Sequence, residues 1–383
     1  MYGGSGGRGV VVYPRASKRH INFNYEVTMK KADMIIDLQY GSTGKGLIAG
    51  YLGHHGEYDM VINANMPNAG HTFIDAKGQK MIHKVLPNGL VGSKVKDVMI
   101  GPGSIFSLGQ LEKELDDLER FGYNNFDLWI HEDAVVLRPE HKHAEQTDDV
   151  LANIGSTQQG TAAAMIQKLM RNEVRNPTAK AALGLMPVWK DRLLNQHDWL
   201  LALQSANEIL IEGAQGYSLG INAGFYPYCT SRDCTPARFL ADCGVPLQYL
   251  RRTIGTARLH PIRVGGNSGG HYLDQEEITW QLLGQPEERT TVTNKVRRIF
   301  TWSQTQIEEA LLACQPEHVF LNFCNYAPAT VEHVKGQIIK AGHKAGYSPI
   351  VAYTGWGPTI NDVKARMQDP CEMTRVELAR GNG

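Results

Sequence analysis

The chain has 383 residues, of which 42% are hydrophobic and 20% charged, and its formal net charge at pH 7 is zero. These values are ordinary for a soluble globular protein with one large α/β domain or two smaller ones. The neutral charge balance gives no indication of a nucleic acid or an anionic membrane as partner. No apolar run approaches the roughly 18 residues of a membrane span. We therefore expect neither nucleic acid nor membrane as a partner.

The first 30 residues differ from the rest of the chain. They are rich in glycine and basic residues, their first acidic residue is Glu26, and they lack the apolar core of a secretion signal. We expect a disordered extension, or an upstream start codon with Met29 as the functional start; a transit peptide is a weaker alternative. The six cysteines show neither a C-x-x-C pair nor zinc-ligand spacing, which fits reduced thiols in a cytoplasmic protein.

The segment Asp37–Gly46 is the most informative local pattern. An apolar run at residues 34–36 leads into a glycine-rich turn that contains Lys45, and residues 47–52 read as a helix. Such a loop suits phosphate oxygens, because backbone N–H groups and the positive end of a helix dipole point at it. It is not the usual P-loop pattern, since its glycines are too close together and Gly46 replaces the Ser/Thr that would hold magnesium. An ordinary strand-to-helix turn is the alternative.

Strands and helices alternate along the rest of the chain. Strands are predicted at residues 59–64, 98–100, 126–130, 208–212, 319–323 and 350–353. Helices are predicted at residues 108–120, 162–170 and 307–314, the first with a capping box formed by Ser107 and Gln110. This alternation predicts an α/β fold with a mostly parallel central sheet and helices on both faces. Ligands of such sheets lie beyond the carboxyl ends of the strands, where most polar motifs of this chain fall.

Two of these motifs suit phosphate groups. His71 follows Gly70 just beyond a predicted strand, and a histidine at a phosphate site can donate a hydrogen bond to an oxygen that gains negative charge. A structural histidine is the alternative. The segment Gly155–Gly160 offers hydroxyls and backbone amides that suit a phosphate monoester, although a plain Ser/Thr turn has the same pattern. Arg171 follows the predicted helix 162–170, where a solvated charge is the ordinary reading.

Two later motifs suit a base and a carboxylate. Gln215, in the segment Glu212–Gly216, can read a base edge because its amide both donates and accepts hydrogen bonds. The tyrosines and proline of residues 226–231 can simply shape a loop. Residues 291–298 are basic and rich in hydroxyls, so they can clamp a carboxylate or phosphate, or can be a solvated run of charges.

In this order, the motifs resemble the adenylosuccinate synthetase family. That family has a Trp-Gly-Asp-Glu-Gly-Lys-Gly loop, then Asn-Ala-Gly-His-Thr, Gly-Thr-Thr-Gly-Arg-Gly, Glu-Gly-Ala-Gln-Gly, Tyr-Pro-Tyr-Val-Thr-Ser and an arginine-rich aspartate loop. Matching segments run across roughly residues 32–365, and several ordered motifs are far more specific than any one. The resemblance implies a P-loop-type α/β fold, a single domain over residues 31–383 and a C–N ligase activity.

The loop departs from the family at Ser42, where the family has its catalytic aspartate. This replacement resembles the phage PurZ branch, whose enzymes join aspartate to dGMP rather than IMP and so supply a precursor of 2-aminoadenine for phage DNA. Guanine differs from hypoxanthine by a 2-amino group beside N1. A carboxylate reaching N1 would crowd that group, whereas serine leaves room. Such a difference in a dry pocket can change selectivity on the order of 10²–10⁵.

Two further departures concern the nucleotides. Asn325 stands where the family has an aspartate that reads the guanine of GTP. Because an asparagine amide both donates and accepts, it can pair with adenine, so we expect ATP or dATP, with Gly355 and Gly357 near its base. Val296 stands where the family usually has an arginine that reaches the ribose, and this loss fits a deoxynucleotide.

The resemblance implies a role for each matching residue. The catalytic residues are Ser42, Lys45 and His71. ATP or dATP is bound by Gly41, Thr43, Gly44, Lys45, Gly46, Gly70, His71, Thr72, Asn325, Gly355 and Gly357. dGMP is bound by Ser42, Asn68, Thr157, Arg171, Gln215, Thr230 and Val264. L-Aspartate is bound by Thr293 and Arg298, and Mg²⁺ by the backbone carbonyl of Gly70. Arg171 reaches its site from a second subunit, which implies a homodimer, in a host cytoplasm if a phage encodes it.

The sequence is also compatible with other functions. An ordinary adenylosuccinate synthetase that accepts IMP despite Ser42 predicts a preference for IMP over dGMP. A phosphate-binding regulator, ATPase or kinase predicts ATP use without consumption of aspartate, and it leaves the motifs of Gln215 and Thr230 unexplained. A catalytically dead nucleotide-binding module is disfavoured because Lys45 and His71 are both intact.

Overall fold

The computed structural model of the protein describes residues 31–290 and 294–366. Within these residues, the centre is a ten-stranded sheet with the order β17-β16-β15-β11-β1-β10-β2-β5-β7-β9. Its neighbouring strands are parallel, apart from the antiparallel pair of β16 and β17 at one edge. The predicted α/β fold with a mostly parallel central sheet is therefore confirmed.

The strands of the central sheet are β1 (Ala32–Asp37), β2 (Met60–Asn63), β5 (Asp97–Ile100), β7 (Asp127–His131), β9 (Leu193–Leu194), β10 (Ile209–Glu212), β11 (Leu250–Arg258), β15 (His318–Asn322), β16 (Ile350–Gly355) and β17 (Val363–Ala365). The smaller sheets contain β3 (His71–Ile74) with β4 (Lys80–His83), β6 (Ile105–Phe106) with β8 (Val135–Val136), and β12 (Ile262–Arg263) with β14 (Arg298–Phe300) and β13 (Glu277–Ile278).

The α-helices are α1 (Lys45–His55), α2 (Leu108–Phe121), α3 (Pro139–Gln146), α4 (Asp149–Asn153), α5 (Thr161–Leu169), α6 (Ala179–Leu183), α7 (Gln196–Ser205), α8 (Pro236–Cys243), α9 (Gln304–Cys314) and α10 (Val331–Lys344). The predicted strands and helices are all present, with ends shifted by one to a few residues. The predicted capping box was wrong. Ser107 is the N-cap of α2, but its side chain makes no capping hydrogen bond, and the amide of Gln110 donates instead to Glu114.

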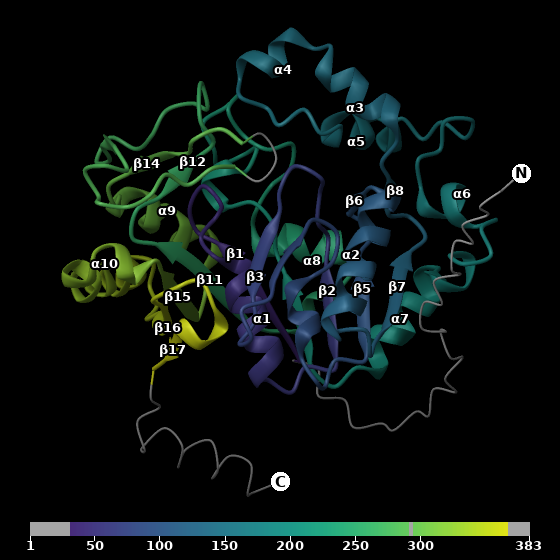
Figure 1. The fold of residues 1–383 in the computed structure, drawn as a ribbon, viewed down its shortest axis with the longest axis horizontal. Coiled ribbons are helices and arrows are strands. Elements are labelled where there is room, and N and C mark those ends of the chain that lie inside the picture. The colour runs from purple at the N-terminus through teal and green to yellow at the C-terminus, as the bar shows by residue number, and fades with distance from the viewer. Residues whose placement is uncertain (1–30, 291–293, 367–383) are drawn as a thin grey trace, which may run out of the picture.

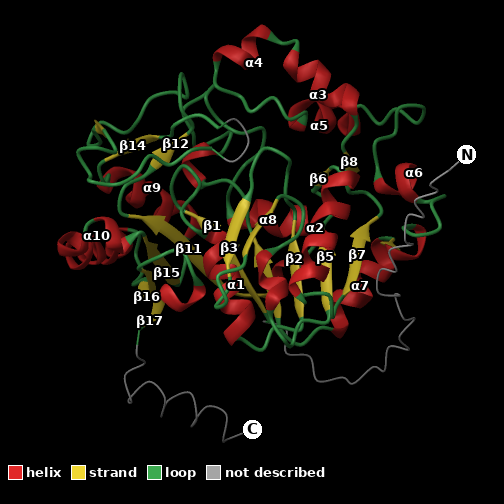
Figure 2. Ribbon diagram, in the orientation of Figure 1, coloured by secondary structure: helices red, strands yellow, loops and turns green. Residues whose placement is uncertain are grey.

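Helices cover both faces of the central sheet, as expected (Figure 2). Successive residues of a strand point to opposite faces. In β1, Met34 and Ile36 accordingly belong to one apolar cluster and Ile35 to another. The first cluster includes side chains of α7, α8, α9 and α10, and the second includes side chains of α1, α2 and α6. Burial on both faces explains why the run Met34–Ile36 in β1 and most residues of β2 and β10 are apolar without polar alternation.

The carboxyl ends of the parallel strands meet at one edge of the molecule. The arrowhead of β7 points to the top of the view, and α3, α4, α5, β12 and β14 lie above that end of the sheet (Figures 1 and 2). The loops that carry the sequence motifs follow β1, β2, β10, β15 and β16, so they come together at this edge. Residues 1–30, including the expected N-terminal extension, and Thr293 lie outside the described residues.

Candidate functional site

The glycine-rich loop connects β1 to α1 through left-handed turns. Gly41 and Gly44 have φ angles of 90° and 95°, a region that glycine enters at little cost. Ser42 has a φ angle of 56° and an exposed side chain, so its hydroxyl stands at the tip of the loop. The helix begins at Lys45, two residues earlier than expected, so this lysine lies in the first turn of α1.

The carboxylate of Asp37, the last residue of β1, stabilises the glycine-rich loop through several hydrogen bonds. This buried carboxylate accepts hydrogen bonds from the backbone N–H groups of Gln39 (2.9 Å) and Gly41 (3.2 Å) and from the hydroxyl of Thr43. It also accepts from the ammonium of Lys45 at 2.9 Å, and that ammonium donates to the backbone carbonyl of Gln215 at 2.7 Å. Sequence reasoning did not select Asp37. A signal was present, because a buried acid at the end of an apolar strand requires a partner.

The backbone of Ser42 is held by a buried arginine. Arg258 donates to the carbonyl of Ser42 at 3.2 Å and forms a two-pronged ion pair with Glu288, at 2.6 and 3.2 Å. Its guanidinium lies 3.7 Å from the ring centre of Phe323. Burial favours the neutral form of Glu288, but the charge and hydrogen bonds of Arg258 outweigh it, and the pKa of Glu288 lies below its ordinary value. Sequence reasoning missed both Arg258 and Glu288.

His71, the first residue of β3, is paired with an acid from another strand. Its Nδ1 lies 2.6 Å from the carboxylate of Glu212, the last residue of β10. The backbone N–H and the amide of Asn88 donate to the same carboxylate, at 2.6 and 3.1 Å. Burial opposes ionisation of Glu212, but the hydrogen bond and charge of His71 and the bonds from Asn88 outweigh it and lower its pKa. Since Nδ1 is occupied, Nε2 is the nitrogen available to a ligand.

The predicted dGMP residues Asn68, Gln215 and Thr230 form a connected group. The amide nitrogen of Gln215 donates to the side-chain oxygen of Asn68 at 2.8 Å, and the amide nitrogen of Asn68 donates to the hydroxyl of Thr230 at 3.3 Å. The group ends on Arg232, whose Nε donates to the side-chain oxygen of Gln215 at 3.0 Å. Arg232 lies one position beyond the motif at residues 226–231 and was also missed.

Asn322, at the end of β15, connects the glycine-rich loop between β1 and α1 to the region predicted to hold the adenine base. Its amide donates to the carbonyl of Thr43 at 3.1 Å. A Cβ atom added to Gly44 or to Gly355 would lie 2.1 Å from this amide, so a larger residue at either position would displace the side chain of Asn322. Asn325 is exposed in the short 3₁₀ helix that follows, at Cys324–Tyr326, where its amide is accessible to a base.

The remaining predicted residues lie farther from the loop. Val264 and Arg298 are linked by Ser268, whose hydroxyl donates to the carbonyl of Val264 at 2.7 Å and accepts from Arg298 at 3.1 Å. Arg298 is not free, because it forms a two-pronged ion pair with Glu277 at 2.9 and 2.6 Å. The hydrogen bond and charge of Arg298 hold the pKa of Glu277 below its usual range.

Thr157 and Arg171 flank α5. Thr157 is half-buried in the loop before the helix, and its carbonyl accepts from the amide of Gln159 at 2.8 Å. Arg171 is exposed directly after the helix. No hydrogen bond or ion pair joins its guanidinium to another residue of the ranges 31–290 and 294–366. Within the described part of one chain, therefore, Arg171 is not joined by a hydrogen bond or ion pair to the other predicted dGMP residues.

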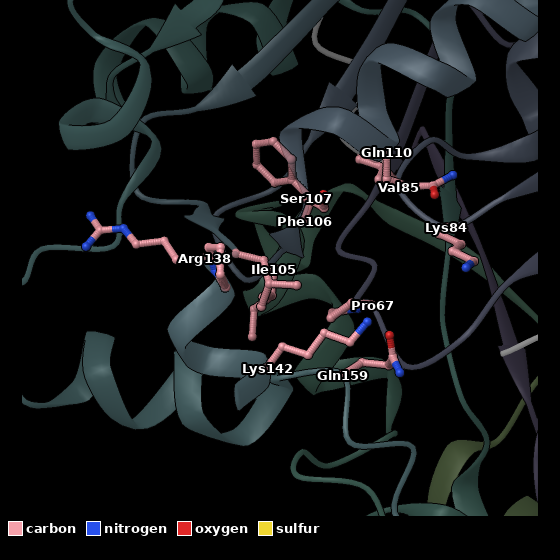
Figure 3. Close-up of a pocket in the computed structure, with 12 residues that line it drawn as sticks. Pro67, Lys84, Val85, Ile105, Phe106, Ser107, Gln110, Arg138, Lys142 and Gln159 are labelled. Atoms are coloured by element: carbon pink, nitrogen blue, oxygen red, sulfur yellow. The ribbon is translucent and has the colours of Figure 1, made fainter. Parts of the chain in front are cut away.

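A cavity of about 420 Å³ is lined by residues that neighbour the predicted dGMP residues Asn68 and Thr157 in the chain (Figure 3). Its wall includes Pro67, next to Asn68, and Gln159, close to Thr157. The ammonium of Lys142 points toward Pro67, whereas the guanidinium of Arg138 points away (Figure 3). The complete lining is Pro67, Lys84, Val85, Ile105, Phe106, Ser107, Gln110, Leu137, Arg138, Pro139, Lys142 and Gln159. It contains basic but no acidic residues, which raises the local potential for an approaching phosphate.

No cluster of three or more His, Cys, Asp or Glu side chains within residues 31–290 and 294–366 is placed to hold a metal ion. No helix in the same ranges has the length and apolar character to cross a membrane.

Comparison with known proteins gives consistent matches along the chain. A sequence profile described as adenylosuccinate synthetase matches residues 34–182 and 177–322. The N6-succino-2-amino-2′-deoxyadenylate synthase of Vibrio phage phiVC8 is 52% identical over 345 residues, which cover 88% of this chain and 99% of the relative. A solved structure of the cyanophage S-2L succinoaminodeoxyadenylate synthetase, bound to dGMP and dATP as an energy donor, superposes with a TM-score of 0.80 at 36% identity. That match covers 91% of this chain and 99% of the other.

A more distant structure supports the fold alone. The adenylosuccinate synthetase of Plasmodium falciparum superposes with a TM-score of 0.71 at 19% identity, covering 88% of this chain and 100% of that chain. The two superpositions show that this chain shares its overall fold with the phage and parasite proteins.

Proposed function

The chain belongs to the adenylosuccinate synthetase family, and from this premise we propose that it joins L-aspartate to dGMP with hydrolysis of ATP or dATP. The product is N6-succino-2-amino-2′-deoxyadenylate, the compound for which the Vibrio phage relative is named. The protein is therefore a C–N ligase that serves the synthesis of 2-aminoadenine DNA. Neither an IMP-specific enzyme nor a regulator without ligase chemistry is favoured.

The observation that carries this proposal is Ser42 at the exposed tip of the loop, in a chain 52% identical to the phage synthase. The family places an aspartate there. A serine is shorter than an aspartate and uncharged, so it leaves room for the 2-amino group of guanine beside N1. Because Arg258 holds the backbone of Ser42 in its left-handed conformation, the hydroxyl stays at the tip of the loop.

The phosphate donor is held by Gly41, Thr43, Gly44, Lys45 and Gly46. The free N–H groups and the dipole of α1 favour its β- and γ-phosphates, and Lys45 adds a point charge. Gly70, His71 and Thr72 lie across the phosphates, and Asn325 reads the adenine base, with Gly355 and Gly357 beside it. The dATP bound by the cyanophage neighbour supports an adenine nucleotide in this role.

The acceptor dGMP is held by Ser42, Asn68, Thr157, Gln215 and Thr230, with Val264 near its sugar. Hydrogen bonds join Gln215, Asn68 and Thr230 into one group, which supports a shared ligand. The basic lining of the neighbouring cavity attracts the 5′-phosphate toward Thr157. The dGMP bound by the cyanophage neighbour supports this assignment.

The reaction has two steps. The O6 oxygen of dGMP attacks the γ-phosphorus, the bond from that phosphorus to the bridging oxygen breaks, and ADP or dADP leaves. The amine of aspartate then attacks C6, and phosphate leaves with O6. Phosphoryl transfer needs positioning and charge neutralisation more than covalent help, and Lys45 and His71 supply both. A serine hydroxyl is a poor base at neutral pH, so the N1 proton passes to water or a phosphate oxygen.

His71 acts through Nε2. Its Nδ1–H is donated to ionised Glu212, so Nε2 donates only when the ring carries a second proton. In that state the Nε2–H group can donate a hydrogen bond to charge that develops on O6 or on the transferring phosphoryl group.

Magnesium fits the site as a partner of the phosphates. Mg²⁺ is usually bound by one or two protein oxygens together with substrate phosphates and water, so it does not need a cluster of acidic side chains. The carbonyl of Gly70 is the protein ligand that we propose, and the bound ion would neutralise charge on the β- and γ-phosphates.

Aspartate is bound by Thr293 and Arg298. Arg298 is paired with Glu277, so a carboxylate of aspartate replaces Glu277 when the substrate enters. Arginine suits this exchange because its planar guanidinium binds either carboxylate through two parallel hydrogen bonds.

We also propose a homodimer in which Arg171 completes the dGMP site of the partner subunit, in the cytoplasm where the nucleotides are found. Exposed apolar side chains lie close to Arg171 in the chain, on α5 and in the segment after it, and exposed apolar side chains of this kind are found at interaction sites. They include Ile166, Leu169, Met170 and Val174.

A coupled assay tests the proposed reaction. The purified protein is incubated with aspartate, ATP, Mg²⁺ and either dGMP or IMP, and the succino-nucleotide is detected by mass. We expect product from dGMP and at most about one hundredth as much from IMP. A clear preference for IMP would overturn the proposal, and ATP hydrolysis without loss of aspartate would reject ligase chemistry altogether.

A further inference from the structure

Arg232 is buried at the edge of the proposed dGMP site. Its side chain is inaccessible to solvent and donates from Nε to the side-chain oxygen of Gln215 at 3.0 Å. One terminal nitrogen donates to the carbonyl of Ala64 at 2.7 Å and lies 3.3 Å from the carboxylate of Asp242. Its guanidinium also lies 5.1 Å from the ring centre of Phe239. These contacts fix both the position and the plane of the guanidinium.

The guanidinium of Arg232 determines which atom donates and which accepts in the hydrogen bonds among Gln215, Asn68 and Thr230. It has donors and no acceptor, so the amide of Gln215 must turn its oxygen toward Arg232. The amide nitrogen of Gln215 then faces the oxygen of Asn68, at 2.8 Å. The amide nitrogen of Asn68 in turn faces the hydroxyl of Thr230, at 3.3 Å. Each orientation follows from the one before it, beginning at Arg232.

The orientation of the two amides determines which atoms can bind a ligand. The side-chain oxygens of Gln215 and Asn68 each accept a hydrogen bond from a neighbouring side chain, whereas each amide nitrogen keeps a second N–H. The hydroxyl of Thr230 accepts from Asn68, so its own hydrogen is free to be donated. The three side chains therefore offer hydrogen-bond donors to a ligand of the proposed dGMP site.

We infer that Arg232 is a positioning residue that makes this part of the dGMP site a donor surface and thereby selects purines with an oxygen at C6. The inference rests on the proposed function. The O6 and N7 atoms of guanine and the oxygens of a phosphate are acceptors, which match the donors. A 6-amino purine such as dAMP presents a donor where dGMP presents O6, and two donors facing each other leave both without a partner.

Loss of Arg232 removes the group that fixes these amide orientations. The oxygen and nitrogen of an amide have nearly the same shape, so Gln215 and Asn68 can then turn over together. In the reversed arrangement the two oxygens face the ligand. The site then accepts a 6-amino group as readily as O6, and its preference declines.

Titration calorimetry without aspartate tests the inference, using dGMP and dAMP as ligands of the full-length protein. For Arg232→Met we expect dGMP affinity to fall about tenfold and the dGMP-to-dAMP affinity ratio to fall by at least about tenfold. ATP affinity should be unchanged. Arg232→Lys keeps a charged donor and should recover part of the ratio.

Arg238→Met is the matched control. Arg238 binds the same acid, Asp242, at 2.8 Å, but it does not contact Gln215. This variant should keep the wild-type ratio. If it reproduces the change, or if Arg232→Met weakens dGMP and dAMP equally, then Arg232 has only a structural role and the inference is overturned.

A second variant covers the case in which Arg232→Met does not fold. In Gln215→Glu, the carboxylate still accepts from Arg232 but has no N–H, so Asn68 must turn its nitrogen toward it. We expect dGMP affinity to fall more than dAMP affinity, and an unchanged ratio would contradict the inference. Failure of the proposed function is distinct, because the wild-type protein would then make no succino-nucleotide from dGMP in the coupled assay.

Discussion

Ser42 is the single residue on which substrate choice depends in this account. It lies in a left-handed conformation that aspartate tolerates better than most residues, so Ser42→Asp should fold. The added carboxylate would crowd the 2-amino group of dGMP but not the corresponding hydrogen of IMP. We predict a shift of the dGMP-to-IMP ratio of kcat/KM toward IMP by about 10- to 100-fold.

Ser42→Ala is the control for this prediction. It removes the hydroxyl and adds no bulk, so the preference for dGMP should persist while overall activity changes. Steady-state kinetics with both nucleotides measure the ratio. If Ser42→Asp leaves the ratio of wild type, then the space beside Ser42 does not determine the substrate.

Glu212 should control the orientation and tautomer of His71. The variant Glu212→Gln keeps the shape of the side chain but replaces the carboxylate beside Nδ1 with an amide. We predict a fall in kcat of about 10²-fold with little change in the KM for ATP. Steady-state kinetics with varied ATP separate the two parameters.

Glu114→Gln provides a matched comparison. Glu114 is another buried glutamate, and it accepts hydrogen bonds from the backbone of residues 84–86 rather than from His71. Its variant should lose stability without the fall in kcat. Equal kcat values for wild type and Glu212→Gln would mean that Glu212 does not act through His71.

At the scale of elements, Asn322 holds the glycine-rich loop between β1 and α1 against β15. A methyl group at Gly44 would lie 2.1 Å from the amide of Asn322, at a φ angle of 95°. We predict that Gly44→Ala lowers stability by about 1–3 kcal/mol and weakens ATP binding, because the loop must shift. Thermal melting and ATP titration measure the two effects.

Gly78→Ala separates backbone strain from the clash. Gly78 also has a positive φ angle, 82°, but an added Cβ there meets no atom within 4 Å. It should lose some stability and keep ATP affinity. ATP binding that is equally weakened in both variants, or intact in Gly44→Ala, would show that contact with Asn322 does not shape the loop.

The hairpin of β3 and β4 contains a histidine that should make the fold sensitive to acid. His83 pairs across the hairpin with His71, is fully buried, and has no hydrogen-bond partner for either ring nitrogen among the described residues. Burial lowers the pKa of His83 to about 4. Between this value and about 6.5, the unfolded chain takes up a proton that the folded chain refuses, so stability falls as pH falls.

We therefore predict that His83→Leu reduces the acid sensitivity of the fold. The variant should lose up to about 1.4 kcal/mol less per pH unit than wild type between pH 6.5 and about 4. Urea unfolding at pH 7, 6 and 5 measures the difference. The same slope in both proteins would mean that His83 is protonated in the folded state.

At the scale of the whole molecule, the order of motifs along the chain predicted the architecture. Apolar strands followed by glycine-rich loops indicated a parallel sheet, and the motifs after β1, β2 and β10 meet because these strands are neighbours in it. The supporting partners could not be predicted in the same way. Glu212 lies 141 positions from His71, and the bond between Arg258 and the carbonyl of Ser42 spans 216 positions. Such pairs depend on tertiary packing, which local patterns do not contain.

The proposed dimer yields a test by complementation. Arg171→Ala and Lys45→Met should each abolish most activity alone, since one removes a residue given to the partner and the other a residue used within its own subunit. Mixed and re-associated, they should recover about a quarter of wild-type activity, because half of the dimers are mixed and each has one intact site. No recovery, together with a monomer in sedimentation, would contradict the shared site.

A crystal structure of the protein with bound dGMP tests most directly whether Ser42 admits this nucleotide. We predict that the purine binds between Ser42 and Gln215, with its 2-amino group in the space beside the serine and its 5′-phosphate near Thr157. A purine bound far from Ser42, or one whose 2-amino group points away from it, would contradict the claim that this serine admits dGMP.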